Sequence, residues 1–265
     1  MPPPSAKNWI AVTPSRFPWE QEALDFIHEK FPAGSDYLAW SNFEFIASDG
    51  SINETDLLIA SPWGVFLIEI KSRPGRISGD NGTWTWIGED GGRYTDDNPI
   101  LLTNRKCKRL KDLLGRQTAL RNRNVPYIQH LVFCSAPDQV LQLAPDARNF
   151  ICVRDNAEKS RPGIRAAVFQ RQCMGLRPAT ERLVDGPTLK ALAQAMASAG
   201  LRQRRRKVGG FRFGPPPLRK PDRRVSGLGG PPLHERVGAS LGSDLPQRNA
   251  GGKGGPAGRR GSGEA

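Results

Sequence analysis

Three charged residues lie in a segment whose other side chains are nearly all apolar. Asp56 precedes the apolar run 57–60, and Glu69 and Lys71 end a second apolar run that begins at Val65. Burying two carboxylates and an ammonium group side by side costs several kcal/mol per ion, so a sheet does not carry them for stability. A bound metal ion would offset this cost. These residue types therefore point to metal chemistry at this place in the chain.

A β-hairpin is the element that must position these residues. Residues 57–60 and 65–70 are rich in strand formers, and the Ser-Pro-Trp-Gly sequence of residues 61–64 has turn chemistry. The second strand is apolar on both faces, as expected at the centre of a sheet. Side chains alternate along a strand, so Glu69 and Lys71 should project from the same face. Asp56 can then lie near Glu69 across the hairpin.

The segments around the hairpin alternate between strand-like and helix-like patterns, which predicts an α/β domain with a central mixed sheet flanked by helices. The expected helices are 18–31, 104–114 and 186–199, and the further expected strands are 40–47, 82–86, 127–134 and 149–153. We expect the first helix to cover one face of the sheet and the second helix to pack against the sheet.

The first expected helix has a carboxylate at the head of its apolar face. Glu20, Leu24, Ile27 and Phe31 share one face at spacings of four, three and four residues. Two interpretations stay open. Glu20 either favours the helix dipole from the first turn, or it faces the sheet close to a metal ion. Glu22 is the next candidate for the second role.

With its flanking sequence, the Asp56…Glu69-x-Lys71 pattern resembles the PD-(D/E)xK nuclease superfamily, and within it the nuclease-related (NERD) domain. The resemblance covers roughly residues 8–155. It includes Trp19-Glu-Gln-Glu-Ala-Leu24, Trp40-Ser-Asn-Phe-Glu-Phe45, Lys71-Ser-Arg-Pro-Gly75, Gly79-Asp80, Trp84-Thr-Trp86, Asp97-Asn-Pro99 and Asn104-Arg-Lys106. The sequence looks most like the NERD domain at the front of serine/threonine kinases of bacteriophage-exclusion and phage-growth-limitation systems. It therefore implies a restriction-endonuclease-like core.

This resemblance also implies roles for the charged residues. Asp56, Glu69 and the carbonyl of Ile70 would ligate Mg²⁺ or Mn²⁺. Lys71 would orient or deprotonate the attacking water, or stabilise developing negative charge. Glu20 would be the metal-proximal carboxylate that such folds often carry on their first helix.

Two classes of function follow from these residues. The first is a metal-dependent DNA endonuclease of a bacterial phage-defence type, which would hydrolyse phosphodiester bonds. The second is a non-catalytic NERD module for interaction or sensing, originally the front end of a protein kinase, in which Glu69 and Lys71 merely pair. No complete set of kinase motifs follows in the sequence, so we expect no kinase activity.

Basic residues cluster on the expected helix 104–114. Arg105, Lys106, Lys108 and Arg109 could contact DNA phosphates, each contact adding salt-dependent affinity. The alternative is that they form an ordinary solvated helix face. We expect DNA as the partner, together with other components of a phage-defence system.

The positive charge of the chain is concentrated at its C-terminal end. The whole chain has 39 Lys and Arg against 26 Asp and Glu, whereas residues 201–265 alone hold 15 against 4. We therefore expect a NERD domain over residues 8–200 and a disordered Gly/Pro/Arg-rich tail over 201–265. The tail is either a frameshifted or truncated remnant of a kinase domain, or a genuine basic tail that binds nucleic acid.

The remaining features of the sequence suggest the cytoplasm. No stretch of about 18 apolar residues could span a membrane, and the first residues lack the pattern of a signal peptide. The four cysteines form no Cys-x-x-Cys pair, which favours reduced thiols over a zinc site or disulfides.

Overall fold

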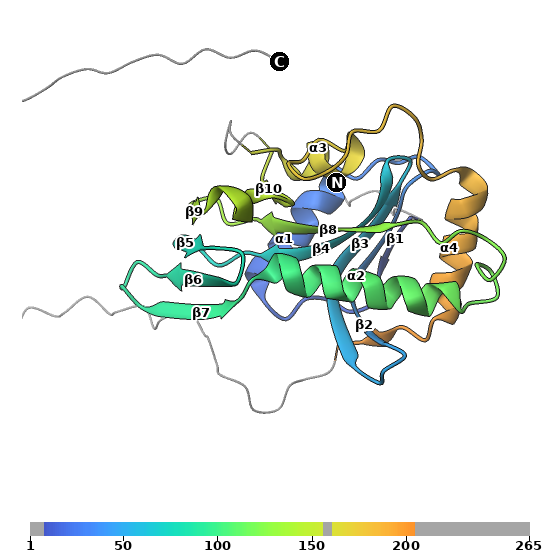
Figure 1. Cartoon of the computed structure of the whole chain (residues 1–265), viewed down its shortest axis with the longest axis horizontal. Coiled ribbons are helices and arrows are strands. Elements are labelled where there is room, and N and C mark those ends of the chain that lie inside the picture. Colours follow the sequence, from blue (N-terminus) through green and yellow to red (C-terminus); the bar gives the residue numbers. More distant parts are fainter. Residues whose placement is uncertain (1–7, 156–160, 205–265) are drawn as a thin grey trace, which may run out of the picture. The chain divides into compact units, whose positions relative to one another are not determined.

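A mixed β-sheet with helices on both faces forms the centre of the described fold (Figure 1). The computed structural model describes residues 8–155 and 161–204. Within these ranges the main sheet has the strand order β1-β2-β3-β4-β8-β10, and β11 also pairs with β2. The strands are β1 (Trp9–Ala11), β2 (Leu38–Ile46), β3 (Ile52–Ser61), β4 (Gly64–Lys71), β8 (Ile128–Cys134), β10 (Ile151–Val153) and β11 (Arg202–Gln203). The predicted α/β architecture with a central mixed sheet is confirmed.

Strand direction changes across this sheet. Strands β2, β3 and β4 form an antiparallel meander, whereas β4, β8 and β10 run parallel to one another. The predicted hairpin is β3–β4, with Leu57 opposite Ile68 and Ser61 opposite Gly64. Strand β3 begins at Ile52, where the hairpin was expected to begin, and its polar first half pairs with β2.

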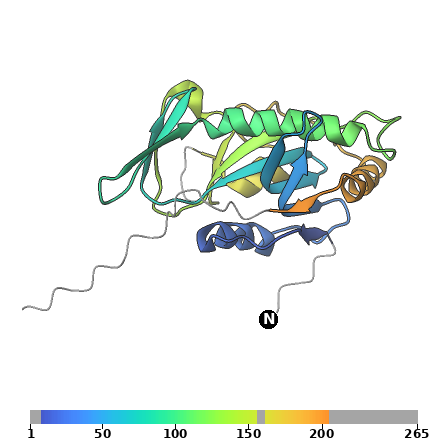
Figure 2. The same ribbon diagram turned by 90° about the horizontal axis from the view of Figure 1, so that it is seen from below.

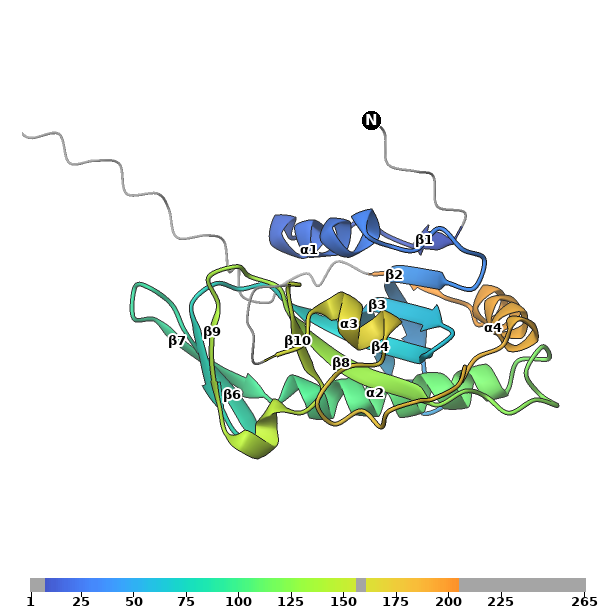
Figure 3. The ribbon, with the colours of Figure 1, turned by 90° about the horizontal axis from the view of Figure 1, so that it is seen from above.

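Helices cover both faces of the sheet. They are α1 (Pro18–Glu29), α2 (Pro99–Gly115), α3 (Ile164–Phe169) and α4 (Gly186–Ser198). Figures 2 and 3 show α1 and α2 on opposite sides of the strands. One core cluster joins α1 and α3 to the sheet, and a second joins α2 and α4 to its other face. The expected packing of both helices on the sheet is thus observed.

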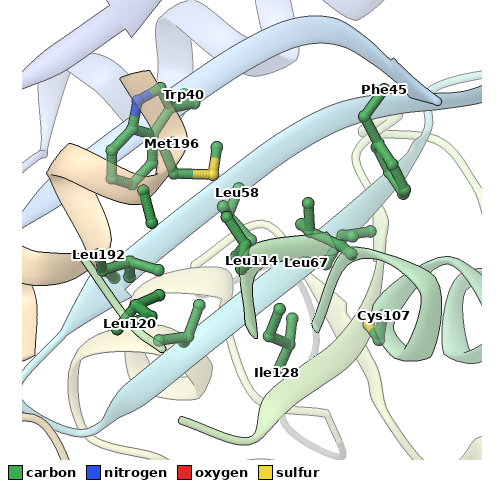
Figure 4. Packing of buried hydrophobic residues seen from close by; sticks show 14 of the residues in the cluster. Trp40, Phe45, Leu58, Leu67, Cys107, Leu114, Leu120, Ile128, Leu192 and Met196 are labelled. Carbon is green, nitrogen blue, oxygen red and sulfur yellow. The ribbon is translucent and has the colours of Figure 1, made fainter. Parts of the chain in front are cut away.

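Helix α2 buries one stripe of its surface in the second cluster. Cys107, Leu110 and Leu114 point into the core at spacings of three and four residues. Figure 4 shows Cys107 and Leu114 of this stripe packed toward Leu67 and Ile128 of the sheet. The helical period therefore leaves the basic residues of α2 on its flanks and outer side.

Helix α2 begins five residues before its predicted start, because Asn98 caps it. The Asn98 side chain accepts a hydrogen bond from Ile100 N–H at 2.8 Å. Its amide also donates to the carbonyls of Asp80 and Asn81, both at 3.1 Å. Pro99 then occupies the first turn, where a missing N–H is tolerated.

Replacing Asn98 with Ala is expected to lower the free energy of unfolding by about 2 kcal/mol, because a helix cap and two loop hydrogen bonds are lost from a buried site. The matched control is Asp185→Ala, which removes the exposed cap of α4 and should cost about 1 kcal/mol. Urea denaturation measures both. Equal losses in the two variants would contradict a role for Asn98 beyond capping.

A second, smaller sheet begins just after β4. It consists of β5 (Arg76–Gly79), β6 (Thr83–Ile87), β7 (Arg93–Asp97) and β9 (Val140–Leu143), in the order β7-β6-β5-β9. Only β6 was predicted from the sequence. Every residue of β7 lies at an exposed position, so the strand has no buried apolar face from which a sequence pattern could arise.

The structure extends the folded domain past the predicted boundary at residue 200. Strand β11 pairs with the edge of β2, and Arg204 is part of the same fold. The expectations for residues 205–265, including disorder and a kinase remnant, lie outside the described residues. The four cysteines form no disulfide in the part of the chain that is described. No helix in that part is both long and apolar enough to cross a membrane.

Candidate active site

The hairpin places Asp56 and Glu69 on neighbouring strands of one sheet. Asp56 directly precedes the position where Leu57 of β3 pairs with Ile68 of β4. Its Oδ2 accepts a hydrogen bond from Ile70 N–H at 2.7 Å, and the side chain is buried. Burial and the nearby charge of Glu69 raise the pKa of the Asp56 carboxyl above its usual range. The two carboxylates thus form one electrostatically coupled group.

Glu69 is neutralised by two lysines. Its Oε1 lies 2.9 Å from the Nζ of Lys71, and its Oε2 lies 2.7 Å from the Nζ of Lys106. Burial alone would raise the pKa of Glu69, but the two ammonium groups outweigh burial and hold this pKa well below its usual range. Glu69 is therefore an ionised carboxylate at neutral pH.

Lys71 projects from the same face of β4 as Glu69, as strand alternation predicts. Burial alone would lower the pKa of Lys71, but the charges of Glu69 and Asp56 outweigh it and raise this pKa above its usual range. Lys71 is therefore a protonated ammonium group in this arrangement. A cation of this kind can stabilise negative charge, but it cannot accept a proton from water.

Glu20 faces the sheet from the first turn of α1, with 9% of its surface exposed. Burial and the charge of Asp56 raise the pKa of Glu20 to about 7, against the lowering effect of Arg204. The interpretation of Glu20 as a carboxylate facing the sheet is the one that this geometry favours. Glu22 instead points away from the cluster and pairs with Arg154.

Arg204 is one of two site residues, with Glu54, that sequence reasoning missed. Its Nη1 lies 2.8 Å from the Oε1 of Glu20, and its Nη2 lies 3.2 Å from the Oε2 of Glu54 and 3.0 Å from the Oδ1 of Asp56. Arg204 lies in the basic run that reads as the start of the tail, and no local pattern distinguishes it from its neighbours. Its position depends on the pairing of β11 with β2.

The structure separates the four basic residues of α2. Lys106 points inward to Glu69, and Arg109 pairs with Asp49 at 3.0 Å. Arg105 and Lys108 are exposed. Arg105 and Lys108 are three positions apart and therefore lie on one side of the helix, whereas Lys106 and Arg109 are already engaged with carboxylates.

The donor atoms fit a hard cation in chemical kind, because Mg²⁺ and Mn²⁺ prefer carboxylate and carbonyl oxygens. They do not fit one as they are now arranged. Both oxygens of Asp56 and both oxygens of Glu69 already accept hydrogen bonds or pair with cations. Among the residues that the structure describes, no group of three His, Cys, Asp or Glu side chains could hold a metal ion.

Glu20 should make the stability of the protein depend on pH. Its pKa is about 7 in the folded state, against an ordinary value near 4.5 in the unfolded chain. The folded state therefore keeps a proton that the unfolded chain loses, and this contribution to stability falls as pH rises from about 4.5 to about 7. The full effect is on the order of 3 kcal/mol.

The measurement compares the free energy of unfolding of the wild type and of Glu20→Gln across this range. His130, whose pKa burial lowers to about 4, contributes the opposite slope in both proteins and cancels in their difference, which reports Glu20 together with its electrostatic effect on Asp56. We expect the wild type to lose stability relative to Glu20→Gln as pH rises. A difference that stays constant with pH would show that Glu20 titrates normally.

Part of the chain is similar to known proteins. Residues 15–135 match the family model described as "Nuclease-related domain". A stretch of 114 residues is 42% identical to the "Probable kinase PglW" of Streptomyces coelicolor A3(2). This match covers 43% of the chain but only 7% of that relative, so the chain spans a small part of the relative's length. No solved structure gives a significant match.

Proposed function

Since residues 15–135 are a nuclease-related domain, we propose that this chain hydrolyses phosphodiester bonds of DNA with the help of Mg²⁺ or Mn²⁺. One observation carries the proposal. Four carboxylates lie together with Lys71 at the open end of the β3–β4 hairpin, away from its turn. They belong to Glu20, Glu54, Asp56 and Glu69. Such a set of charges is costly to bury and serves no packing purpose, which favours a functional site.

Each residue of the site has a role in this proposal. Asp56, Glu69 and the Ile70 carbonyl would hold the cation, and Glu20 would lie beside it. When bound, the cation would polarise the phosphate and activate water. Lys71, which the neighbouring carboxylates keep protonated, is suited to stabilise the negative charge that develops on the phosphate.

DNA would reach the site past the exposed cations of α2. Arg105 and Lys108 are exposed, whereas Lys106 and Arg109 are engaged with acidic side chains. We therefore assign phosphate contacts to Arg105 and Lys108, and a role in holding Glu69 to Lys106. Phage DNA in the cytoplasm is the substrate that the sequence resemblance suggests, with other components of a phage-defence system as partners.

A plasmid-nicking assay on the full-length chain tests the proposal. Supercoiled plasmid is incubated in Mg²⁺ or Mn²⁺ with the wild type and with Arg204→Gln, with chelator as the control. The variant is included because it removes the arginine that pairs with Asp56. We expect open-circular DNA only with the metal. If neither protein nicks the plasmid in either metal, the nuclease proposal is wrong.

A non-catalytic interaction or sensing module is the second candidate. The observation that favours it is the pairing of Glu69 with Lys71 and Lys106, and of Asp56 with Arg204, which balances much of the charge without a metal ion. This module would bind no Mn²⁺ in calorimetry, in the wild type or in Arg204→Gln.

A further inference from the structure

Arg204 reaches the carboxylate cluster because a short strand fixes its backbone. Arg202 and Gln203 of β11 pair with Glu44 and Phe43 of β2, on the same strand whose earlier part pairs with β1. The Arg204 N–H then donates to Thr13 Oγ1 at 3.2 Å, and its carbonyl accepts a hydrogen bond from Arg16 at 2.9 Å. Figure 2 shows this strand beside β2, on the side of the sheet where α1 lies.

The guanidinium group holds carboxylates from two elements of the fold. Glu20 comes from α1, and Glu54 and Asp56 come from β3. The planar group contacts all three within 3.2 Å and is itself mostly buried, with 21% of the side chain exposed. Arginine is suited to this task, because its fork of donors matches several carboxylate oxygens at once and remains charged at any physiological pH.

Asn42 contacts the same guanidinium group. Its Oδ1 accepts a hydrogen bond from Nη1 of Arg204 at 3.2 Å. Asn42 is buried in the middle of β2 with φ of 52°, a left-handed conformation that strands rarely contain. Its Nδ2 has no hydrogen-bond partner among the described residues. Backbone strain and an unsatisfied buried amide are typical of functional sites rather than of stable packing.

Arg204 and a metal ion would need the same oxygen atoms. Nη2 of Arg204 contacts Oδ1 of Asp56, whereas Oδ2 is engaged with Ile70 N–H. A divalent cation at Asp56 would therefore replace the guanidinium. Two features of β11 make this exchange feasible: the strand has only two residues, and both are exposed, so little apolar burial holds it at the sheet edge.

We propose that Arg204 is an internal cation that keeps the site closed: it occupies the carboxylates of Glu20, Glu54 and Asp56, and must leave before a divalent cation can bind. The inference rests on the proposed function for its purpose, since a nuclease needs control over when it cuts. It concerns cation binding, however, and can be tested without any nuclease activity.

Calorimetric titration of the full-length chain with Mn²⁺ tests the proposal. Arg204→Gln should bind Mn²⁺ at least tenfold more tightly than the wild type, because the carboxylates lose their internal cation. The matched control is Arg202→Gln, which removes an exposed arginine from the same strand and should bind as the wild type does. Arg204→Lys should fall between the two, because a single ammonium group cannot bridge three carboxylates.

Thermal unfolding supplies a second measurement. Without metal, Arg204→Gln should unfold at a lower temperature than the wild type, because three carboxylates then lack their partner. Mn²⁺ should raise the unfolding temperature of this variant more than that of the wild type, as expected for tighter binding to the folded state. If Arg204→Gln does not fold, the titration of Arg204→Lys decides, and an affinity equal to the wild type overturns the proposal.

The outcomes separate this inference from the nuclease proposal. Equal Mn²⁺ affinity in the wild type and Arg204→Gln would show that Arg204 is only a structural ion pair, even if both proteins nick DNA. Equal tightening by Arg202→Gln and Arg204→Gln would show a general charge effect, which also overturns the inference. Tighter binding by Arg204→Gln alone, without nicking, would support the inference and refute the nuclease proposal.

Discussion

Replacing Glu69 with Gln is expected to abolish metal-dependent nicking, with a loss of at least about 100-fold. The change removes a carboxylate from the proposed cation site while preserving the size of the side chain. Asp56→Asn should cause a loss of similar size, since its oxygens belong to the same site. The measurement is the nicking rate in Mg²⁺ and Mn²⁺, preferably in the Arg204→Gln background, where Asp56 no longer pairs with an arginine.

The two substitutions should differ in stability. Glu69→Gln leaves Lys71 and Lys106 without their anion, and breaking a buried pair of this kind costs about 3–5 kcal/mol. Asp56→Asn should cost much less, because burial and Glu69 already disfavour the ionised form of Asp56, and Asn can still accept from Ile70 N–H.

Glu29→Gln, at an exposed position near the end of α1, is the control and should change neither activity nor stability. Full activity in either Glu69→Gln or Asp56→Asn would eliminate these carboxylates as catalytic groups. Equal stability of Glu69→Gln and Asp56→Asn would contradict the finding that the site lowers the pKa of Glu69 and raises the pKa of Asp56.

Replacing Lys71 with Met is expected to lower the nicking rate by about 100-fold while changing Mn²⁺ affinity much less. The physical reason is that Lys71 does not hold the cation, but places a positive charge beside the reacting phosphate. Single-turnover kinetics and calorimetry on the same variant measure the two effects separately.

Lys190→Met is the matched control for Lys71→Met, because Lys190 is exposed on α4 and lies outside the carboxylate cluster. It should nick DNA at the wild-type rate. If Lys71→Met loses Mn²⁺ affinity and rate to the same extent, Lys71 acts by organising Glu69 rather than by stabilising the phosphate.

Strand and helix periodicity explain how much of the site the sequence determines by itself. The side-chain period of two places Glu69 and Lys71 on one face of β4, and the 3.6-residue period turns Glu20 toward the sheet with Leu24. These relations involve residues within a few positions of one another, so they survive in any fold that contains the same strand and helix. The apolar runs of the hairpin likewise determine that β3 and β4 are adjacent.

The tertiary structure decided which cations meet these carboxylates. Lys106 and Glu69 are 37 positions apart, and Arg204 and Glu20 are 184 positions apart. No local period relates such residues. Lys106 reaches Glu69 because α2 packs across β4 and β8, and Arg204 reaches Asp56 because β11 adds to the edge of β2. Long-range contacts of this kind depend on how whole helices and strands pack against one another. Local patterns of residue types do not predict that packing.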